Sequence, residues 1–397
     1  MRDTVRPVLL DVTRLVSRSW TARRSTGIDR VCYAYLKHYR YRALAVVQYR
    51  GVIRVLDHAM SDRLFEMLLA PSRGFRASFA AFLSRILFAR KPAIDLAGLT
   101  YLNLSHTDFD LSDHGNWVAR EGLRPVYFIH DLIPILQPQL SRPHAVARHM
   151  GRVLSALRSA EQIVVSSQTV AVDLHQFAAQ MGLPVPQLIV APIAGEAFVP
   201  RPQDLPDTYF LCVGTIEPRK NHAVLIEAWR GLAARLGKNA PKLVIAGQTG
   251  PMTGDILGPL SSPALSQHIE LKAKCDDREL ADLMSNASAL LFPSVAEGFG
   301  LPLAEALRMG TPAIASDIPV FRELGQGIPT LVAAKDAMAW QDAILHRLEN
   351  PISAADRRLN AASYVAPTWE EHFRVVEGEI ASSGLKTHAH YESSLAA

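Results

Sequence analysis

The sequence predicts an α/β protein with two doubly wound domains of parallel strands. Short apolar runs alternate with helix-length amphipathic segments over most of the 397 residues, which is typical of parallel sheets with crossover helices. The proline-rich segment Val199–Pro206 separates two such series, and the length accommodates two domains of roughly 150–200 residues. The expected divisions are an N-terminal domain at 1–200, a second domain at 207–365, a helix at 367–381 that packs back toward the first domain, and a flexible tail at 382–397.

Apolar runs bounded by turn residues indicate strands, and apolar positions three and four apart indicate helices. In the first domain the expected strands are Val8–Val12, Leu44–Tyr49, Thr100–Leu104, Val126–Ile129, Ile163–Ser166 and Leu188–Val190, and the helices are Gly27–His38, Pro143–Ala160 and Val170–Met181. In the second domain the strands are Tyr209–Val213, Lys242–Ala246, Ile269–Leu271, Ala289–Phe292 and Ala313–Ala315. The helices that follow are His222–Leu236, Asp277–Asn286, Leu303–Met309, Ala337–Asn350 and Trp369–Ile380.

The net charge of +4 is unevenly distributed along the chain. The first 100 residues contain 18 Lys and Arg but only 7 Asp and Glu, and such a basic region either attracts anionic surfaces or forms a solvated face. We expect no nucleic-acid partner, because no recognition motif accompanies the charge. The basic amphipathic segment Leu64–Lys91 could lie among anionic headgroups on the inner face of the cell membrane, or pack on the core with its arginines in water.

Cysteine usage and hydropathy predict a cytoplasmic protein. Cys32, Cys212 and Cys275 are far apart and lack the spacing of metal ligands, which fits a reducing compartment. The N-terminus lacks the apolar run of a secretory leader, and no stretch of about 18 apolar residues predicts a membrane span. No cluster of aspartates resembles a divalent-metal site, so we expect no bound metal.

The first chemical motif is a strand followed by a cationic loop. Tyr209–Val213 is apolar and ends at Gly214, which permits a tight turn or the close approach of a ligand. In the loop, Arg219 can bind two phosphate oxygens through its guanidinium group, while Lys220 supplies a mobile point charge. Ligands of such sheets bind at the carboxyl ends of the strands. This order of residues therefore favours a phosphate site over a solvated surface.

The second motif joins two carboxylates to a glycine-rich turn and a helix start. Gly298, Phe299 and Gly300 form a turn whose amides can approach a phosphate, and the helix that follows begins with a positive dipole end. Glu305 lies in the first turn of that helix, where it either stabilises the dipole or accepts hydrogen bonds from the two hydroxyls of a ribose. Glu297, at the strand end, could accept hydrogen bonds from a sugar.

Two strand ends in the first domain present histidines. Val126–Ile129 is followed by His130 and Asp131, which could be a structural histidine beside a helix-capping aspartate. They could equally be contacts with a sugar, because they lie at the ligand-binding edge of a parallel sheet. His106, which follows the strand Thr100–Leu104, is a second candidate of the same kind.

The two motifs Gly214–Asn221 and Glu297–Glu305 resemble the signature motifs of the retaining glycosyltransferase family 4. The likeness covers nearly the whole chain and is most specific over residues 209–325. It implies the GT-B fold, in which two Rossmann-like domains face each other across a cleft. It also implies transfer of a hexose from a nucleotide-diphosphate sugar to an acceptor hydroxyl, with retained configuration, without a metal and by a front-face substitution that needs no protein nucleophile.

The resemblance implies a role for each matched residue. The family's arginine and lysine hold the donor diphosphate and its second glutamate binds the ribose, which implies Arg219, Lys220 and Glu305. Its first glutamate and the histidine of a His-Asp-Leu-Ile-Pro string meet the transferred sugar, which implies Glu297 and His130 as catalytic residues. The amides near sugar and phosphate would be those of Gly298, Phe299 and Gly300, and the carboxylate beside the histidine would be Asp131.

A third match opens the first long helix. Thr26–Arg30 resembles a glycine-rich turn that lies near the phosphate and the acceptor in similar enzymes, and it keeps Gly27 and Arg30. Asp29 stands where the family usually has glycine. Its carboxylate would repel a close phosphate, so Asp29 could instead bind an acceptor hydroxyl.

The donor and the acceptor follow from the resemblance only as alternatives. Members with similar strings are often mannosyltransferases that use GDP-mannose, which is therefore the expected donor, and UDP-glucose and other UDP-sugars are the alternative. The expected acceptor is a glycan on a lipid diphosphate carrier in cell-envelope polysaccharide synthesis. Two other functions are possible on this fold: a nucleotide-sugar epimerase or hydrolase, which needs no glycan acceptor, and a catalytically silent scaffold, which the intact motifs argue against.

Overall fold

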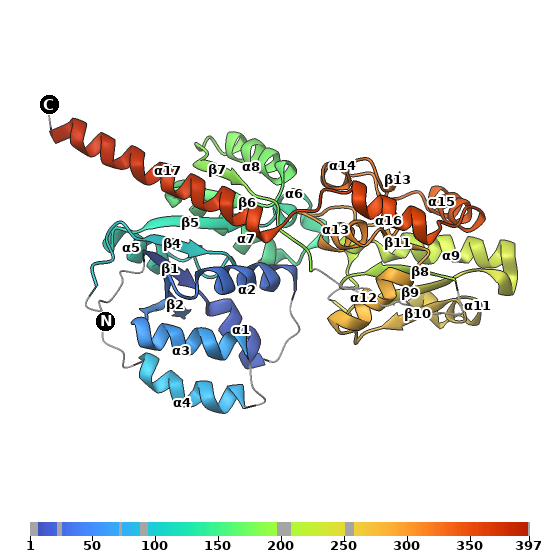
Figure 1. Cartoon of the computed structure of the whole chain (residues 1–397), viewed down its shortest axis with the longest axis horizontal. Coiled ribbons are helices and arrows are strands. Elements are labelled where there is room, and N and C mark those ends of the chain that lie inside the picture. Colours follow the sequence, from blue (N-terminus) through green and yellow to red (C-terminus); the bar gives the residue numbers. More distant parts are fainter. Residues whose placement is uncertain are drawn as a thin grey trace. The chain divides into compact units, whose positions relative to one another are not determined.

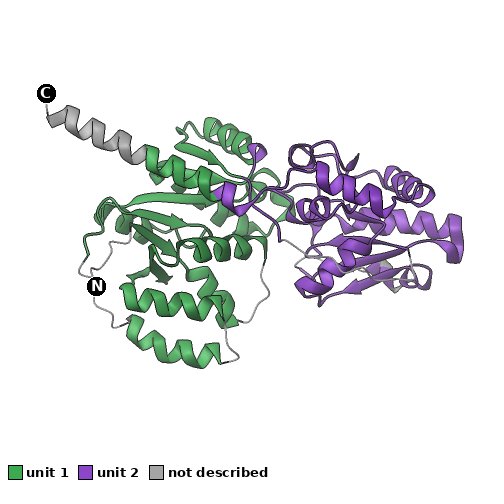
Figure 2. Cartoon of the chain, in the orientation of Figure 1, with its two compact units in different colours: residues 1–166, 170–191, 373–397 green, residues 167–169, 192–372 purple. Residues whose placement is uncertain are grey.

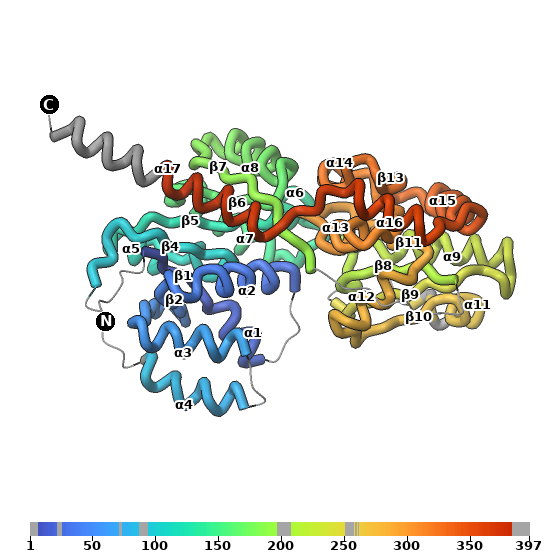
Figure 3. Tube along the Cα trace, viewed as in Figure 1, coloured from blue at the N-terminus to red at the C-terminus, as the bar shows by residue number. Residues whose placement is uncertain are grey.

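The structure is a computed structural model, and it describes residues 7–21, 26–70, 74–87, 94–196, 208–250 and 258–395 (Figure 1). The chain divides into two compact units (Figure 2). Unit 1 contains residues 1–166, 170–191 and 373–397, and unit 2 contains residues 167–169 and 192–372. The chain therefore forms most of unit 1, continues into unit 2 and returns to unit 1 in its last helix (Figure 3). The expected linker Val199–Pro206 lies outside the described residues.

Unit 1 is built on a seven-stranded sheet in the order β3-β2-β1-β4-β5-β6-β7. Neighbouring strands are parallel except for β3, which is antiparallel to β2. The direction of chain progression reverses between β1 and β4, and ligands of doubly wound sheets bind where the carboxyl ends of two such strands meet. The strands are β1 (Val8–Asp11), β2 (Ala43–Tyr49), β3 (Val52–Val55), β4 (Thr100–Asn103), β5 (Arg124–Ile129), β6 (Gln162–Val165) and β7 (Gln187–Val190).

Helices that follow these strands bury their apolar faces against the sheet. The core includes the fully buried Leu9 of β1, Tyr101 of β4 and Tyr127 of β5. The α3 helix begins at an aspartate cap, because Asp57 accepts a hydrogen bond of 2.8 Å from the Met60 amide. The helices are α1 (Thr13–Thr21), α2 (Gly27–Tyr39), α3 (His58–Leu69), α4 (Phe75–Leu87), α5 (Ser112–Arg120), α6 (Ile133–Leu136), α7 (Pro143–Ser159) and α8 (Gln168–Gln180), with a short 3-10 turn, η1 (Pro138–Leu140).

The basic amphipathic segment Leu64–Lys91 turns its apolar face inward, as far as it is described. The buried side chains of α4 are Phe75, Phe79, Phe82 and Ile86. Arg76 and Arg85, on the opposite side of the helix, are exposed. Of the two arrangements that the sequence allowed, the structure has the one in which the helix packs on the core with its arginines in water. The aromatic face of α4 is therefore not available to insert among lipid headgroups.

Unit 2 is built on a six-stranded sheet in the order β10-β9-β8-β11-β12-β13. All of its strand pairs are parallel, and the chain progression reverses between β8 and β11. The strands are β8 (Tyr209–Val213), β9 (Lys242–Ala246), β10 (Ile269–Lys272), β11 (Ala289–Phe292), β12 (Ala313–Ser316) and β13 (Thr330–Val332). The apolar runs of β8 and β11 are completely buried, as expected for central parallel strands covered on both faces.

The helices of unit 2 pack around two buried tryptophans. Trp229 of α9 donates a hydrogen bond of 2.8 Å to the Pro241 carbonyl, and Trp340 of α15 donates one of 3.2 Å to the Ala333 carbonyl. Both indole N–H groups are thus satisfied inside the core. The helices are α9 (His222–Leu236), α11 (Pro263–Ser266), α12 (Asp277–Asn286), α13 (Leu301–Arg308), α14 (Pro319–Gly325), α15 (Ala337–Glu349) and α16 (Ala354–Ser363), with 3-10 turns η2 (Pro218–Lys220), η3 (Gly237–Asn239) and η4 (Gly258–Ser261).

The last helix, α17 (Trp369–Leu395), is longer than the sequence predicted. The sequence predicted that this helix ends at Ala381, whereas α17 continues to Leu395. Within unit 1, the Phe373 ring stacks on His38 of α2 at a centroid distance of 3.8 Å. Glu377 accepts a hydrogen bond of 2.6 Å from Arg42, in the turn between α2 and β2, so α17 is held by a ring stack on α2 and by an ion pair with the turn that follows it.

Candidate active site

The two predicted motifs of unit 2 meet where the strand order reverses. β8 and β11 are hydrogen-bonded neighbours with Leu211 opposite Leu290, so the loops that leave their carboxyl ends are adjacent. The first loop carries η2 with Arg219 and Lys220, and the second carries Glu297 before α13 begins. The Arg219 carbonyl accepts a hydrogen bond of 3.0 Å from the Val295 amide, which ties the two loops together directly.

The cations of the first loop bind the carboxylate of the second. Lys220 Nζ lies 2.5 Å from Glu297 Oε1, and Arg219 Nη1 lies 2.6 Å from Glu297 Oε2. Arg219 also donates a hydrogen bond of 3.0 Å to the Ala296 carbonyl and one of 2.8 Å to Glu217 Oε1. Lys220 Nζ lies 4.8 Å from the centre of the Phe292 ring. Both cationic tips therefore point into one cluster at the end of β11.

Because the cluster is largely buried, water screens the interactions between its charges only weakly. The side chains of Lys220 and Glu297 are only 11% and 9% exposed. Burial by itself would raise the pKa of Glu297, but the charges of Arg219 and Lys220 outweigh it and hold that pKa at about 2. Burial lowers the pKa of Lys220, and the neighbouring Glu297 opposes that shift. Glu297 is thus an ionised carboxylate between two cations in a poorly hydrated place.

Asn221, to which the sequence motif assigned no role, shapes the cationic loop. Its backbone is left-handed, with φ of 54°, a conformation that asparagine tolerates better than most residues. Its side-chain amide donates 3.1 Å to the Pro293 carbonyl and 2.7 Å to the Ala334 carbonyl. Asn221 therefore joins the loops after β8, β11 and β13, and its place just after Arg219 and Lys220 was the available signal for this role.

The Gly298–Gly300 turn leads into α13 as predicted. Gly300 has φ of 107°, and a Cβ there would lie 2.9 Å from the Phe321 ring, so both the conformation and the space require glycine. The Gly298 carbonyl accepts a hydrogen bond of 2.8 Å from Ser167, and Phe299 is buried. The turn thus lies at the amino end of α13, where peptide amides attract anions.

Glu305 lies on α13 and is only 2% exposed. Its Oε1 accepts a hydrogen bond of 3.1 Å from the Glu196 amide. Gly195 packs directly on it, since a Cβ at that position would lie 2.6 Å from Glu305 Cγ. The missing side chain of Gly195 thus makes room for Glu305.

In unit 1 a group of histidines lies at the ends of β4 and β5. His130 donates a hydrogen bond of 2.7 Å from Nε2 to the Leu104 carbonyl, so its Nδ1 is the unprotonated acceptor nitrogen. Its ring centroid is 5.2 Å from that of His106. Burial lowers the pKa of His130 to about 4, which keeps the imidazole neutral near pH 7. Asp131 accepts from the Ile133 amide at 3.0 Å and so caps the turn that begins α6.

His106 occupies a strained position beside His130 and His149. Its φ is 61°, which is uncommon for a residue other than glycine, and burial holds its pKa well below the usual value. Its Nε2 is buried without a hydrogen-bond partner. His149, which the sequence did not single out, donates 2.9 Å to the Asp131 carbonyl and lies 5.2 Å from His106 between ring centroids.

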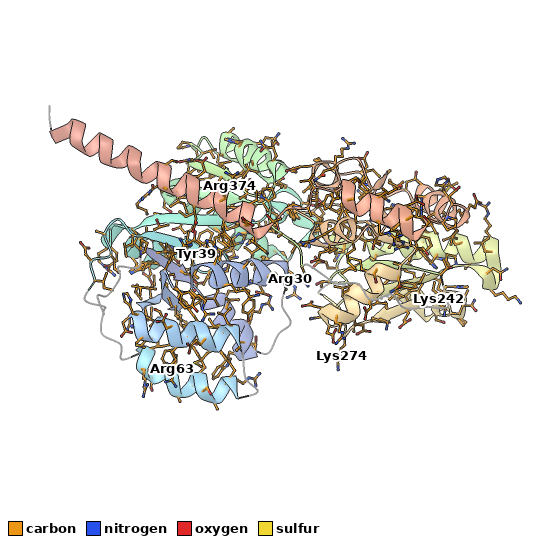
Figure 4. All side chains as sticks on the ribbon, in the orientation of Figure 1. Arg30, Tyr39, Arg63, Lys242, Lys274 and Arg374 are labelled. Carbon is orange, nitrogen blue, oxygen red and sulfur yellow. The ribbon has the colours of Figure 1, made fainter. Side chains whose placement is uncertain are left out.

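Asp29 requires a correction. We expected its carboxylate to be available for an acceptor hydroxyl, but it is completely buried and lies 2.5 Å from Arg14 and 3.2 Å from Arg18. It also accepts 2.7 Å from the Thr26 amide, which makes it the third residue of a capping box at the start of α2. The expected contacts Gly27 and Arg30 lie on the same first turn, and Figure 4 labels Arg30 on α2.

Comparison with known proteins finds a family model that resembles part of this chain. Residues 196–364 match the family described as glycosyl transferases group 1, and this range contains both motifs of unit 2. The serotype-specific mannosyltransferase WbdA of Escherichia coli is 32% identical over 220 residues, which are 50% of this chain and 27% of WbdA. The O-antigen chain mannosyltransferase RfbU of Salmonella typhimurium is 34% identical over 155 residues, or 37% of this chain and 41% of RfbU.

The chain spans less than half the length of these two curated relatives. Among solved structures, Alr3699/HepE of Anabaena in complex with UDP has a TM-score of 0.62 at 15% identity, over 94% of this chain and 99% of that one. This likeness confirms the predicted GT-B fold of two parallel-sheet α/β domains. Within the described residues, no helix is both long and apolar enough to span a bilayer.

Proposed function

We propose that the protein is a retaining glycosyltransferase that transfers a hexose, mannose from GDP-mannose in the first instance, to a glycan acceptor on a lipid diphosphate. The observation that carries this proposal is the gathering of Arg219, Lys220 and Glu297 where the strand order of unit 2 reverses. A half-buried arginine and a largely buried lysine beside the amino end of α13 form a suitable site for a diphosphate leaving group.

The proposed chemistry follows from this arrangement. The bond between the anomeric carbon and the diphosphate breaks while an acceptor oxygen bonds to the same face of that carbon, and the acceptor proton passes to the departing diphosphate. Arg219 and Lys220 stabilise the growing negative charge, and each such contact is worth about 3–4 kcal/mol of barrier in comparable sites. Glu297 positions the sugar and forms no covalent bond. Glu305 binds the ribose, and the amides of Gly298, Phe299 and Gly300 approach the sugar and phosphate.

Unit 1 contributes recognition of neutral groups. We assign His130 a contact with a hydroxyl of the hexose through Nδ1, which is its acceptor nitrogen. His106, Asp131, Gly27 and Arg30 are further candidate contacts for the sugar or the acceptor. We propose that no metal takes part, as the resemblance to the retaining glycosyltransferase family 4 implies.

The proposed identities of the donor and the acceptor rest on the relatives. WbdA and RfbU are named mannosyltransferases, and RfbU acts on the O-antigen chain, which supports mannose and a lipid-linked polysaccharide intermediate. The structure of HepE contains UDP, which supports the alternative of a UDP-sugar. Any contact of α4 with the anionic inner face of the membrane would be electrostatic, because the apolar face of this helix is buried.

A ligand-binding screen followed by a product assay tests the proposal. A nucleotide that binds the folded protein raises its melting temperature, so we expect GDP and GDP-mannose to raise it more than UDP and UDP-glucose. Purified protein with GDP-mannose should then form a mannosylated product only when a lipid-linked glycan is added. If no nucleotide raises the melting temperature, the proposal is wrong. Conversion of the sugar nucleotide without any acceptor would instead identify an epimerase or a hydrolase.

A further inference from the structure

Glu297 is the shared counter-ion of both cations in the cluster. Its two carboxylate oxygens are used separately, Oε1 by Lys220 and Oε2 by Arg219. The same N–H donors would hold the diphosphate of the proposed donor. A diphosphate that binds to these donors therefore stands next to an ionised carboxylate of the protein. In a place so poorly hydrated, the repulsion between two anions is only weakly screened.

A hexose on the diphosphate changes this balance. Sugar hydroxyls donate hydrogen bonds, and a carboxylate only accepts them. A hexose beside Glu297 can therefore replace the N–H donors that the diphosphate takes away, and the carboxylate remains satisfied. A bare diphosphate offers no such replacement, because its own oxygens are acceptors. It must either remain next to Glu297 or leave Glu297 without partners, and both outcomes weaken its binding.

We infer that Glu297 determines the site's discrimination between the intact sugar nucleotide and the bare nucleoside diphosphate that remains after transfer. The carboxylate weakens the binding of the product by competing for Arg219 and Lys220, and the hexose of the donor removes that competition. This role rests on the proposed function and extends it from sugar contact to product release. The pKa of Glu297, at about 2, keeps the competing charge present throughout the physiological pH range.

Two other carboxylates of unit 2 are less suited to this role. Glu217 also contacts Arg219, at 2.8 Å, but it is 24% exposed and has no contact with Lys220 among the ion pairs of the described residues. Water can therefore screen its charge. Glu305 accepts a hydrogen bond from the Glu196 amide. Glu217 consequently provides a matched control, because it is a carboxylate on the same arginine at a wetter position.

Calorimetry with two ligands tests the inference. The dissociation constants of GDP and GDP-mannose, or of the UDP pair if the screen selects it, are measured for the wild type, Glu297→Gln and Glu217→Gln. We expect Glu297→Gln to bind the bare diphosphate about tenfold more tightly, which corresponds to about 1.4 kcal/mol. Its affinity for the intact donor should not increase, so its ratio of donor to product affinity falls. Glu217→Gln should change both affinities by less than about twofold.

The outcomes separate this inference from the proposed function. If the wild type binds neither nucleotide, the proposed function fails. If it binds both but Glu297→Gln binds the bare diphosphate no more tightly, the inference fails alone. Because Glu297→Gln leaves Lys220 without its counter-ion, we expect the variant to melt at a lower temperature than the wild type. The bare diphosphate should then raise the melting temperature of the variant more than that of the wild type. Failure of that restoration also overturns the inference.

Discussion

Each unit places a buried carboxylate at the point where its strand order reverses, and the two carboxylates have opposite surroundings. Glu297, after β11 in unit 2, lies between Arg219 and Lys220, and its pKa is lowered to about 2. Asp11, at the end of β1 in unit 1, accepts hydrogen bonds from Gln48 at 2.6 Å and Tyr101 at 2.9 Å. These donors are neutral, and burial raises the pKa of Asp11 to about 6.

This contrast shows that the carboxyl-terminal edges of two similar parallel sheets can differ in their chemistry. In unit 2 full charges balance each other, and the site is suited to an anion that exchanges with a carboxylate. In unit 1 the hydrogen-bond partners of the carboxylate are neutral: Gln48 and Tyr101 contact Asp11, His114 contacts Gln48 and Tyr127 at 3.2 and 3.1 Å, and His130 is held neutral by burial. Such an edge is suited to hydroxyl groups rather than to phosphate.

Removal of one cation should give the largest effect. Lys220→Ala deletes a charge that the diphosphate would contact, so we expect kcat/KM for the sugar nucleotide to fall about 100- to 1,000-fold. Lys274→Ala removes an exposed lysine from the same unit (Figure 4) and should leave kcat/KM unchanged. Steady-state kinetics of both variants measure kcat/KM. Equal kinetics for Lys220→Ala and Lys274→Ala would show that the charged edge of unit 2 does not bind the donor.

The two carboxylates should respond to pH in opposite directions. The folded-state pKa of Asp11 is raised from 3.8 to about 6, so its stabilising effect is complete below pH 3.8 and is lost as the pH rises through 6. The folded-state pKa of Glu297 is lowered from 4.5 to about 2. Its contribution to stability is therefore complete above pH 4.5 and is lost as the pH falls toward 2. Relative to Asp11→Asn, the wild type should therefore lose up to about 3 kcal/mol of stability between pH 4 and 7.

Melting temperatures of the wild type and Asp11→Asn across this pH range measure the difference. Asp342→Asn, at an exposed position of α15, is the control and should follow the wild type at every pH. Parallel profiles for Asp11→Asn and the wild type would mean that the Asp11 network does not hold an extra proton in the folded state.

A packing change tests the position of Glu305. In Gly195→Ala the new Cβ would lie 2.6 Å from Glu305 Cγ and 3.3 Å from its Oε1, so Glu305 must move. We expect a loss of about 1–3 kcal/mol in stability together with weaker nucleotide binding, read by thermal unfolding and calorimetry. Gly115→Ala in α5, where no atom lies within 4 Å of the added Cβ, should change neither the stability nor the nucleotide affinity. Normal nucleotide affinity in Gly195→Ala would argue against a ribose contact by Glu305.

The smallest expected effect belongs to His130. A hydrogen bond between neutral groups contributes about 0.5–1.5 kcal/mol, so His130→Ala should lower kcat/KM about tenfold. Because the neutral edge is proposed to recognise the sugar, the dissociation constant of the bare diphosphate should stay unchanged. His175→Ala, at an exposed position of α8, serves as the control. A weaker affinity of His130→Ala for the bare diphosphate would contradict the proposed division between the two edges.

Elements with strong periodicity were predictable, and elements defined by their partners were not. The strand Tyr209–Val213 and the helix His222–Leu236 have the predicted bounds, because continuous apolar runs and 3.6-residue periodicity are local properties. β3 and β13 were missed, since each is only three or four residues long and lies at a sheet edge. The α17 helix extends past its predicted end although Gly384 follows that end.

The sequence by itself determined the two motifs of unit 2, because Gly214, the adjacent cations and the Gly298–Gly300 turn are contiguous and their chemistry is intrinsic to the residue types. Only the tertiary structure decided how those groups are paired. That Glu297 bridges both cations, that Asp29 is buried against Arg14 and Arg18, and that Gly195 makes room for Glu305 all depend on residues distant in the chain. Burial and charge pairing act through space, so local sequence cannot specify them.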